Sequence, residues 1–324
     1  FFFTQTTAYA ILSGLVGSEM CIRDSFALIG LGYSAAITRF FPEEATTYLT
    51  KFIFYFALSA MLFRFSSNLS LSELYDPEFI FAYLSASLII YFLATAVAIF
   101  RKKSPSEAAV EAQCSVIGNV GFLGIPMLAI LMGAEAVGFI MLILAIDLIV
   151  FGSLIVLIIV AGKDKKLDIS LFYRVLLGLM KNPMIVSITC GLLWSASGWS
   201  IPVPINEFVI ILGSAATPGA LFAIGASLAQ KSTERFEVAA WLSFCKLVLH
   251  PIAVFIAVFY VFKVEPYAAT VMIAAASLPV AGNIFMVAQH YNVAPKRASA
   301  AIFLSTVHSI LTVSFTIAWV NNLN

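Results

Sequence analysis

The chain is organised around Gly118-Asn119-Val120-Gly121-Phe122-Leu123-Gly124-Ile125-Pro126 and its distant counterpart Leu278-Pro279-Val280-Ala281-Gly282-Asn283. Each stretch lies in the middle of an apolar segment long enough to cross a bilayer. Each also contains glycine, proline and asparagine, which interrupt a helix. An unpaired backbone group costs several kcal/mol in hydrocarbon, so such interruptions persist only where protein or a watery cavity satisfies them. Two interrupted spans in matching places of two halves indicate the binding site of a secondary transporter.

The composition indicates a membrane protein that crosses the bilayer many times. Of 324 residues, 61% are hydrophobic and only 11% are charged, which is unlike a soluble domain. The formal net charge of +1 gives no reason to expect a nucleic-acid partner. The four cysteines, Cys21, Cys114, Cys190 and Cys245, show no paired spacing, so we expect small buried or lipid-facing residues and not disulfides or metal ligands.

The first 25 residues differ in character from the rest. The segment 1–25, which ends Leu15-Val16-Gly17-Ser18-Glu19-Met20-Cys21-Ile22-Arg23-Asp24-Ser25, resembles a translated sequencing-adapter read-through. A signal peptide is the competing interpretation, but a basic n-region and an A-x-A site are both missing. We therefore expect a non-native segment, followed by a first span that lacks its opening turns.

Apolar runs predict ten spans, an all-α architecture without a separate soluble domain. The expected spans are Phe26–Phe41, Tyr48–Phe65, Phe79–Phe100, Ala108–Leu131 (broken), Ala136–Val160, Pro183–Ser197, Ile205–Gln230, Phe236–Phe262, Tyr267–Asn292 (broken) and Lys296–Val320. Residues 26–161 form a first five-helix repeat, residues 162–181 a polar loop, and residues 182–324 a second repeat.

The basic residues predict the orientation in the membrane. One alternate set of loops contains Arg39, Lys51, Arg101, Lys102, Lys103, Lys163, Lys165, Lys166, Arg174, Lys181, Lys231, Arg235, Lys296 and Arg297. The opposite side has only Arg64 and Lys263 once Arg23 is set aside. This asymmetry predicts a cytoplasmic-membrane protein with basic loops in the cytoplasm and both termini outside.

Similar segments in the two halves of the sequence predict an inverted repeat. Leu58-Ser59-Ala60-Met61-Leu62-Phe63 in the second span parallels Thr217-Pro218-Gly219-Ala220-Leu221-Phe222 in the seventh, and the broken fourth span parallels the broken ninth. Five spans on each side of a basic loop enter the membrane in opposite senses. We therefore expect a 5+5 inverted repeat in which broken helices 4 and 9 cross.

Four motifs in order resemble the auxin efflux carrier family, in its prokaryotic form with a short central loop. They are Asn119–Pro126, Thr217–Leu228, Lys246-Leu247-Val248-Leu249-His250-Pro251, and Ser277–Phe285 followed by Ala288-Gln289-His290-Tyr291. The likeness extends from about Phe26 to the C-terminus. One departure is Ser59, where the family often has a proline, and this concerns the scaffold more than the site.

The resemblance implies an elevator-type alternating-access carrier of the superfamily that also contains bile-acid, arsenite and riboflavin transporters. Spans 1, 2, 6 and 7 would form a scaffold, and the other six a core that moves the crossover site through the lipid bilayer. The implied substrate is a small organic anion, a mono- or dicarboxylate such as malate or malonate. A homodimer is compatible with such a carrier.

The two breaks predict the substrate site. Pro126 suits the first position of a half-helix, and the half-helix after Pro279 would aim its positive end at the same point from the opposite side. Together they offer free N–H donors to a carboxylate without any lysine in the pore. The predicted substrate-binding residues are Asn119, Gly121, Gly124, Pro126, Pro279, Gly282 and Asn283. The alternative is a pair of kinked helices packed through glycine.

Few ionisable residues lie inside spans, and each is costly there unless paired or hydrated. Asp147 and Lys246 could form a core pair that senses H⁺ or Na⁺, with Gln113 as a further coupling or gating residue. Snorkelling for Lys246 and a structural hydrogen bond for Asp147 are the alternatives. We expect His250 and His308 to be satisfied polar residues, and Glu111 and Gln113 to mark a solvated helix entrance.

Other functions fit less well. The three histidines and scattered carboxylates form no metal-ligand pattern, nucleophile elbow or H-E-x-x-H motif, so we expect neither an enzyme nor a cofactor. A phosphate-binding loop is missing, which argues against an ATP-driven pump. A transporter-like sensor would need a soluble output domain. A sodium-coupled bile-acid-type symporter stays open, although more acidic side chains would be expected beside its crossover.

Overall fold

The computed structural model describes residues 27–68, 76–133, 135–162, 180, 183–229 and 236–320. The segment 1–25 and most of the polar loop 162–181 lie outside the described residues. Within these ranges the chain is helical, and its only β-type pairing is an isolated bridge between Gly118 and Val280.

The first half contains helices and π-helical turns (η) in close succession. They are Ala27–Ile37, α2 (Glu43–Phe52), η1 (Ile53–Ala57), α3 (Leu58–Ser67), α4 (Pro77–Phe100), α5 (Pro105–Val116), η2 (Val120–Gly124), α6 (Ile125–Met132), α7 (Ala136–Ile146), η3 (Asp147–Phe151) and α8 (Gly152–Ala161). The second half contains α10 (Pro183–Ser197), α11 (Val203–Ser214), α12 (Ala216–Leu228), α13 (Phe236–Phe244), η4 (Cys245–Leu249), α14 (His250–Ile256), η5 (Ala257–Val261), α15 (Pro266–Ala276), α16 (Asn283–Tyr291) and α17 (Pro295–Val320).

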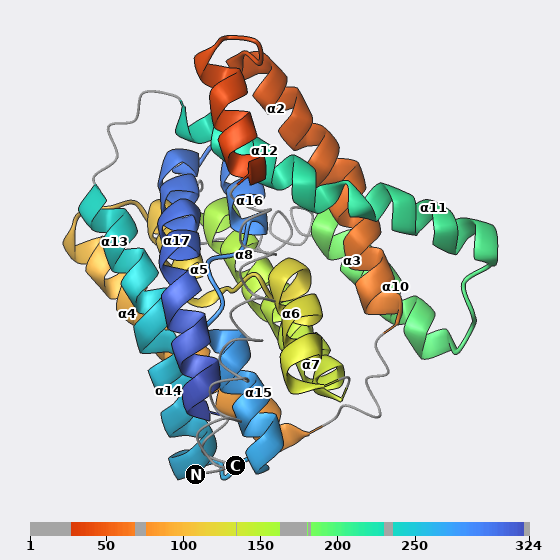
Figure 1. Cartoon of the computed structure of the whole chain (residues 1–324), viewed down its shortest axis with the longest axis vertical. Coiled ribbons are helices and arrows are strands. Elements are labelled where there is room, and N and C mark those ends of the chain that lie inside the picture. Colours follow the sequence, from red (N-terminus) through yellow and green to blue (C-terminus); the bar gives the residue numbers. More distant parts are fainter. Residues whose placement is uncertain are drawn as a thin grey trace, which may run out of the picture.

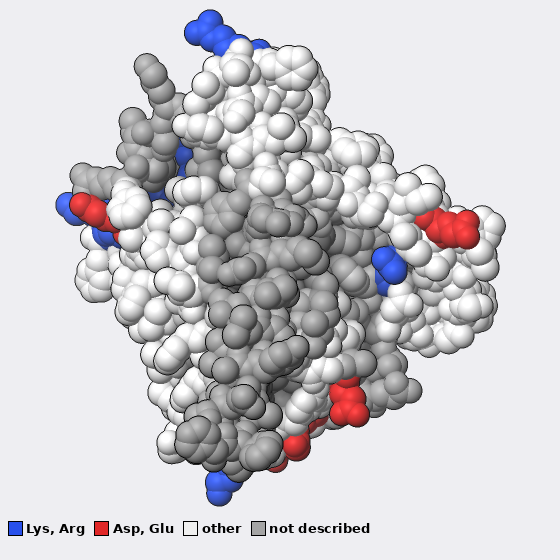
Figure 2. Space-filling view, viewed as in Figure 1, with Lys and Arg blue, Asp and Glu red and all other residues white. Residues whose placement is uncertain are grey.

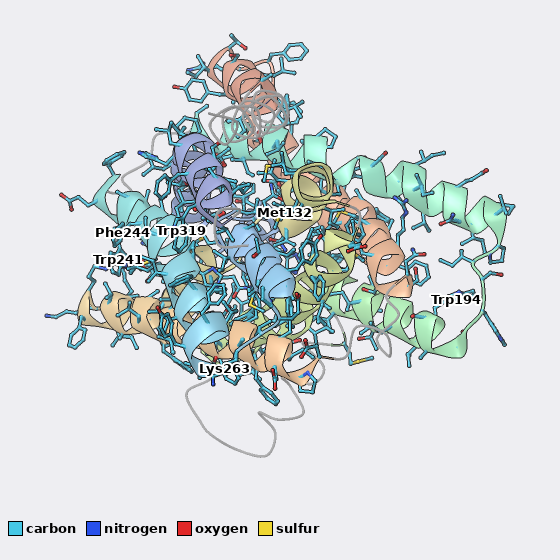
Figure 3. The ribbon with its side chains drawn as sticks, turned by 60° about the horizontal axis from the view of Figure 1, so that its bottom comes forward. Met132, Trp194, Trp241, Phe244, Lys263 and Trp319 are labelled. Carbon is cyan, nitrogen blue, oxygen red and sulfur yellow. The ribbon has the colours of Figure 1, made fainter. Side chains whose placement is uncertain are left out.

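At least five of these helical segments can cross a bilayer. In the described part of the chain the qualifying segments are Glu43–Ser67, Pro77–Phe100, Ala136–Ala161, Val203–Ala226 and Phe236–Val261. Among the described residues, charged side chains lie mostly at the margins of the visible face, and most of the other described surface is uncharged (Figure 2). Trp194 lies at one end of the molecule, close to Trp199 with ring centroids 6.2 Å apart (Figure 3). Trp199 is exposed and Trp194 partly buried, and tryptophans at the end of an apolar helix are typical of a membrane interface.

Local sequence signals explain where several helices begin. Proline follows an acidic or hydroxyl side chain at the starts of α4, α5 and α15, and that side chain accepts a backbone N–H from the first turn. At α5, Ser104 and Glu107 form a reciprocal capping box. Proline is tolerated at these positions because its missing N–H has no helical partner there.

Two π-helical turns precede prolines in the apolar spans. Pro126 is the second residue of α6 and follows η2, and Pro251 is the second residue of α14 and follows η4. Proline inside a helix cannot donate to the preceding turn and pushes its carbonyl away, which a wider turn accommodates. Helical backbone therefore resumes at Val120, six residues before Pro126, where we predicted the start of the half-helix.

The helices fall into two groups (Figure 1). Helices α2, α3, α10, α11 and α12 pack together on one side. Helices α4, α5, α13, α14, α15 and α17 pack together on the other. In the second group, every residue from Ala108 to Val116 of α5 and from Ala268 to Ala276 of α15 is buried. The half-helices that lead into the two breaks are thus enclosed by protein and not by lipid.

Candidate functional site

The two predicted interruptions are present, and they pair with each other. Helix α5 ends at Val116 and α15 ends at Ala276, and helical structure resumes at Val120 and Asn283. Across the gap, the Asn119 N–H donates to the Pro279 carbonyl at 2.8 Å, and the Ala281 N–H donates to the Ile117 carbonyl at 3.1 Å. Protein backbone therefore satisfies the groups that the breaks expose.

Asn119 occupies the centre of a tight turn at the first break. Its φ of −76° and ψ of 54° are those of an inverse γ-turn, and the Val120 N–H donates to the Gly118 carbonyl at 2.8 Å. The Asn119 carbonyl accepts from Leu123 and Gly124, both at 3.0 Å. The backbone of Asn119 thus starts the second half of this segment, and its side chain remains available to the pocket.

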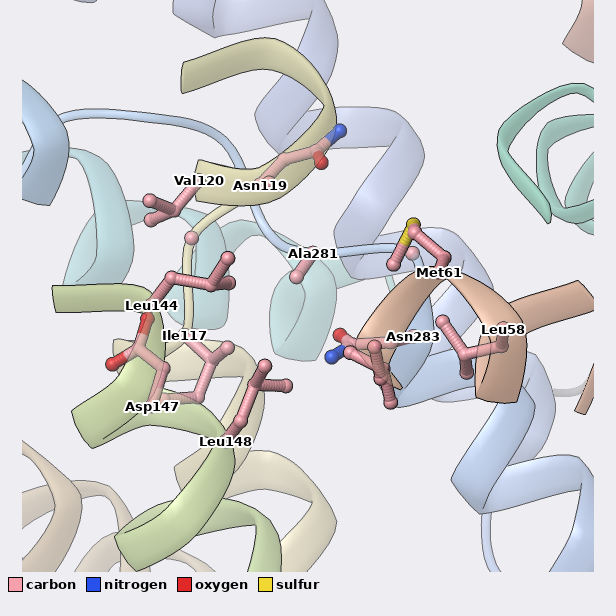
Figure 4. A pocket seen from close by; sticks show the side chains of 14 residues that line it. Leu58, Met61, Ile117, Asn119, Val120, Leu144, Asp147, Leu148, Ala281 and Asn283 are labelled. Atoms are coloured by element: carbon pink, nitrogen blue, oxygen red, sulfur yellow. The ribbon is translucent and has the colours of Figure 1, made fainter. Parts of the chain in front are cut away.

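A small pocket lies beside the paired breaks (Figure 4). Its volume is about 30 Å³, which is room for about one water molecule. The lining residues are Leu58, Met61, Leu62, Ile117, Gly118, Asn119, Val120, Gly121, Leu144, Asp147, Leu148, Ala281, Gly282 and Asn283. Asn119 and Asn283 approach the pocket from the two different breaks (Figure 4), so it combines apolar walls with amide groups.

Four of the predicted substrate-binding residues line this pocket, namely Asn119, Gly121, Gly282 and Asn283. The other three do not. Gly124 lies against Leu278, because a Cβ on Gly124 would come within 2.7 Å of the Leu278 side chain. Pro279 supplies a carbonyl to the bridge, and Pro126 lies in α6. These three positions shape the backbone around the pocket.

Asp147 lines the same pocket from η3. Its side chain is 2% exposed, and its Oδ1 accepts a hydrogen bond from the Tyr83 hydroxyl at 2.8 Å. Its Oδ2 is buried and has no hydrogen-bond partner among the described residues. Such an atom is costly in a protein interior unless a water or an ion reaches it.

Lys246 is fully buried in η4, behind the paired breaks. Its Nζ donates to the carbonyl of Ala276, and it lies 3.3 Å from Nδ1 of His250. Nε2 of His250 lies 3.0 Å from the Ser87 hydroxyl. The described residues therefore contain no direct ion pair between Lys246 and Asp147.

A second cavity, of about 10 Å³, adjoins the pocket and shares Ile117, Asp147, Leu148 and Asn283 with it. Gln113, which is 5% exposed, lines this second cavity. Its Oε1 is buried and unpartnered among the described residues, as is the Oδ1 of Asn283. Unpaired oxygens of Gln113, Asp147 and Asn283 thus belong to residues that line one small cavity.

The prediction of a solvated entrance at Glu111 and Gln113 is wrong, because both side chains are buried. Glu111 forms ion pairs with Arg101 and with Arg297, whose NH1 lies 2.8 Å from Oε1. Both arginines belong to the basic loops that the sequence predicts, with no indication of a buried partner. Tyr83 and Ser87 were not predicted as part of the site, since single hydroxyls in an apolar span carry no pattern. His308 is exposed and lies 2.8 Å from the Leu304 carbonyl.

Comparisons with known proteins match most of the chain to membrane transporters. The family model for membrane transport proteins matches residues 24–317. A relative from Rhizobium meliloti, named "Putative malonate transporter", is 30% identical over 292 residues, which cover 89% of this chain and 91% of the relative. A relative from Escherichia coli K12, named "Uncharacterized transporter YfdV", is 25% identical over 87% of this chain and 91% of its own length.

Proposed function

The chain belongs to the membrane transport protein family, also called the auxin efflux carrier family, and we propose that it is a secondary transporter of a small organic anion. The family and the names of the relatives indicate a transporter and not an enzyme. One observation carries the proposal. Two interrupted helices pair at their breaks, beside a pocket lined by Asn119 and Asn283.

The proposed architecture is ten spans in an inverted 5+5 repeat. Reciprocal glycine contacts support it. A Cβ on Gly32 would lie 2.1 Å from the carbonyl oxygen of Phe222, and a Cβ on Gly191 would lie 2.7 Å from that of Phe63. Gly191 follows Gly32 by 159 residues, and Phe222 follows Phe63 by the same number. Two halves related by a pseudo-two-fold axis produce such exchanged contacts.

The hydrogen bonds between the breaks follow the same rule. The bond from Asn119 to Pro279 has its counterpart in the bond from Ala281 to Ile117. Ala281 follows Asn119 by 162 residues, and Pro279 follows Ile117 by 162. The pattern favours an arrangement in which broken helices 4 and 9 cross at their midpoints.

The pocket suggests how the carrier would move. Leu58, Met61 and Leu62 come from α3, in the first group of helices, whereas the other lining residues come from the two breaks and from η2, α7, η3 and α16, outside that group. A pocket of about 30 Å³ holds about one water, so a carboxylate needs its walls to separate. In an elevator mechanism, sliding of the two broken spans and of the α7–η3 segment against α3 would open this boundary to each side in turn.

We propose that the basic loops face the cytoplasm and that both termini lie outside, on the basis of the positive-inside rule. The protein would thus be a multi-pass component of the cytoplasmic membrane. Single cysteines in place of Lys102 and Lys263 should react with an impermeant reagent from opposite sides. Reaction of both from the same side would overturn this orientation.

The substrate class follows from the pocket chemistry. Amide side chains and half-helix termini can bind carboxylate oxygens, and one relative carries malonate in its name. We expect malonate or a similar dicarboxylate to stabilise the purified protein, by about 2.7 kcal/mol at 100 times its Kd. A thermal-shift screen of carboxylates of increasing size, with and without sodium, measures this effect. Stabilisation by no carboxylate, together with no uptake in vesicles, would refute the proposal.

A cation is the proposed coupling partner, because the unpartnered oxygens of Gln113, Asp147 and Asn283 suit H⁺ or Na⁺. Because these oxygens could bind Na⁺, sodium-coupled symport of the bile-acid type is a second candidate function. A cation at Asp147 would neutralise its charge and favour the anion nearby, and this coupling is reciprocal. We expect Asp147→Asn to flatten the sodium or pH dependence of uptake in vesicles. An unchanged dependence would exclude Asp147 from coupling, and Asp76→Asn, at the exposed start of α4, is the control.

A further inference from the structure

Lys246 has the hydrogen-bonding pattern of a charged ammonium. Its Nζ donates to the carbonyl of Ala276, the last residue of α15. Its other neighbour, Nδ1 of His250 at 3.3 Å, can accept when Nε2 carries the proton and donates to Ser87. The end of a helix carries partial negative charge, which also favours a cation. The Ala276 carbonyl and His250, whose other ring nitrogen lies next to the Ser87 hydroxyl, thus offer acceptors to a positive charge in the apolar interior.

Only a glycine separates this charge from the pocket. A Cβ on Gly118 would lie 3.3 Å from both Cε and Nζ of Lys246. Gly118 itself lines the pocket. The close approach favours glycine at this position, because a Cβ here would be in tight contact with the end of the Lys246 side chain. An anion in the pocket would therefore experience the charge of Lys246 through a thin and weakly polarisable wall.

The opposite charge lies on the pocket wall itself. Asp147 is 2% exposed, and among the described residues its carboxylate has one hydrogen bond, from Tyr83. Without a compensating cation, this carboxylate would repel an anionic substrate in the same pocket. The electrostatic potential in the pocket then depends on Asp147 in the wall and on Lys246 directly behind it.

From this arrangement we propose that Lys246 is a specificity-determining residue of the anion pocket, whose ammonium acts across Gly118 and offsets the charge of Asp147. The inference rests on the proposed anion transport and adds the residues that select the charge of the substrate. It predicts that a dianion depends on Lys246 more than a monoanion of similar shape does. The amide groups of Asn119 and Asn283 differ from Lys246 in this respect, because they would bind a monoanion and a dianion alike.

The test compares binding of malonate and of its monomethyl ester to purified protein in sodium-free choline buffer at one fixed pH. We expect Lys246→Met to weaken malonate binding roughly 10- to 100-fold, and ester binding several-fold less. Asp147→Asn should strengthen malonate binding. The double variant should return close to wild type, because both charges are gone. Leu247→Met, at a buried uncharged neighbour, should leave both affinities unchanged.

Three outcomes would overturn the proposal. They are equal losses for both ligands with Lys246→Met, no gain with Asp147→Asn, and no recovery in the double variant. If Lys246→Met fails to fold, Lys246→Arg and the isosteric Asp147→Asn replace it as the test. The proposal is then supported when Lys246→Arg retains malonate affinity and Asp147→Asn increases it. Wild-type protein that binds neither ligand would remove the proposed function, and this inference with it. Wild-type binding without the charge-dependent differences would remove this inference alone.

Discussion

Uptake into vesicles should be lost, by at least about 100-fold, when Asn119 or Asn283 is replaced by alanine. Both amides line the pocket between the paired breaks, and Oδ1 of Asn283 is buried with no partner among the described residues. A substrate that displaces water from this pocket must receive its hydrogen bonds from the protein. Removal of one amide then leaves part of a desolvated carboxylate unpaired, which costs more than a surface hydrogen bond.

The measurement is initial uptake of labelled dicarboxylate, normalised to the amount of folded protein in the membrane. The backbone bonds of Asn119 and of its partner Pro279 do not involve the side chain, so we expect both alanine variants to insert and fold. Asn206→Ala, in α11 away from the pocket, is the matched control. Wild-type rates for both Asn119→Ala and Asn283→Ala would remove the binding assignment.

The position of this site could be predicted from the sequence because the residues that interrupt its helices are a local signal. Glycine, proline and asparagine interrupt a helix wherever they occur, so the breaks near Gly118 and Pro279 could be placed without knowledge of the fold. Their pairing could be anticipated only through the repeat, which relates the two halves. The π-helical turn before Pro126 was not predicted, because a wide turn and a helix start have the same local sequence signal.

The hydrogen-bond partners of the buried polar residues were harder to predict from the sequence. Lys246 and His250 lie four residues apart in one span, but Ser87 lies in α4, so its contact with His250 depends on how α4 packs against α14. The contact of Lys246 with Gly118 joins residues that are 128 positions apart. Apolar spans are similar in composition all round, so periodicity does not indicate which face is buried. Tertiary packing therefore decided the partners of these residues.

Glu111 shows the same limit, since it was predicted to be solvated and is instead 0% exposed. It joins three elements by accepting from Arg101 at the end of α4 and from Arg297 at the start of α17. Arg297 is itself only 5% exposed, and its second partner, Glu107, lies 3.2 Å away with a side chain that is 29% exposed. The carboxylate of Glu111 thus neutralises charge where water is excluded.

Glu111→Ala should therefore destabilise the protein by about 3–5 kcal/mol, because it leaves a buried guanidinium without its main partner. Glu107→Gln is the matched control in the same helix, because glutamine can keep the capping box with Ser104. The partly exposed ion pairs that it removes should contribute no more than about 1 kcal/mol. Thermal unfolding of the purified variants measures both. Replacing Glu111 and Arg297 together with leucine and methionine should recover part of the loss, since an apolar pair needs no counter-charge. Equal stability of the Glu111 and Glu107 variants would mean that this ion-pair network does not hold α5 against α4 and α17, and the first half of the broken span would need another anchor.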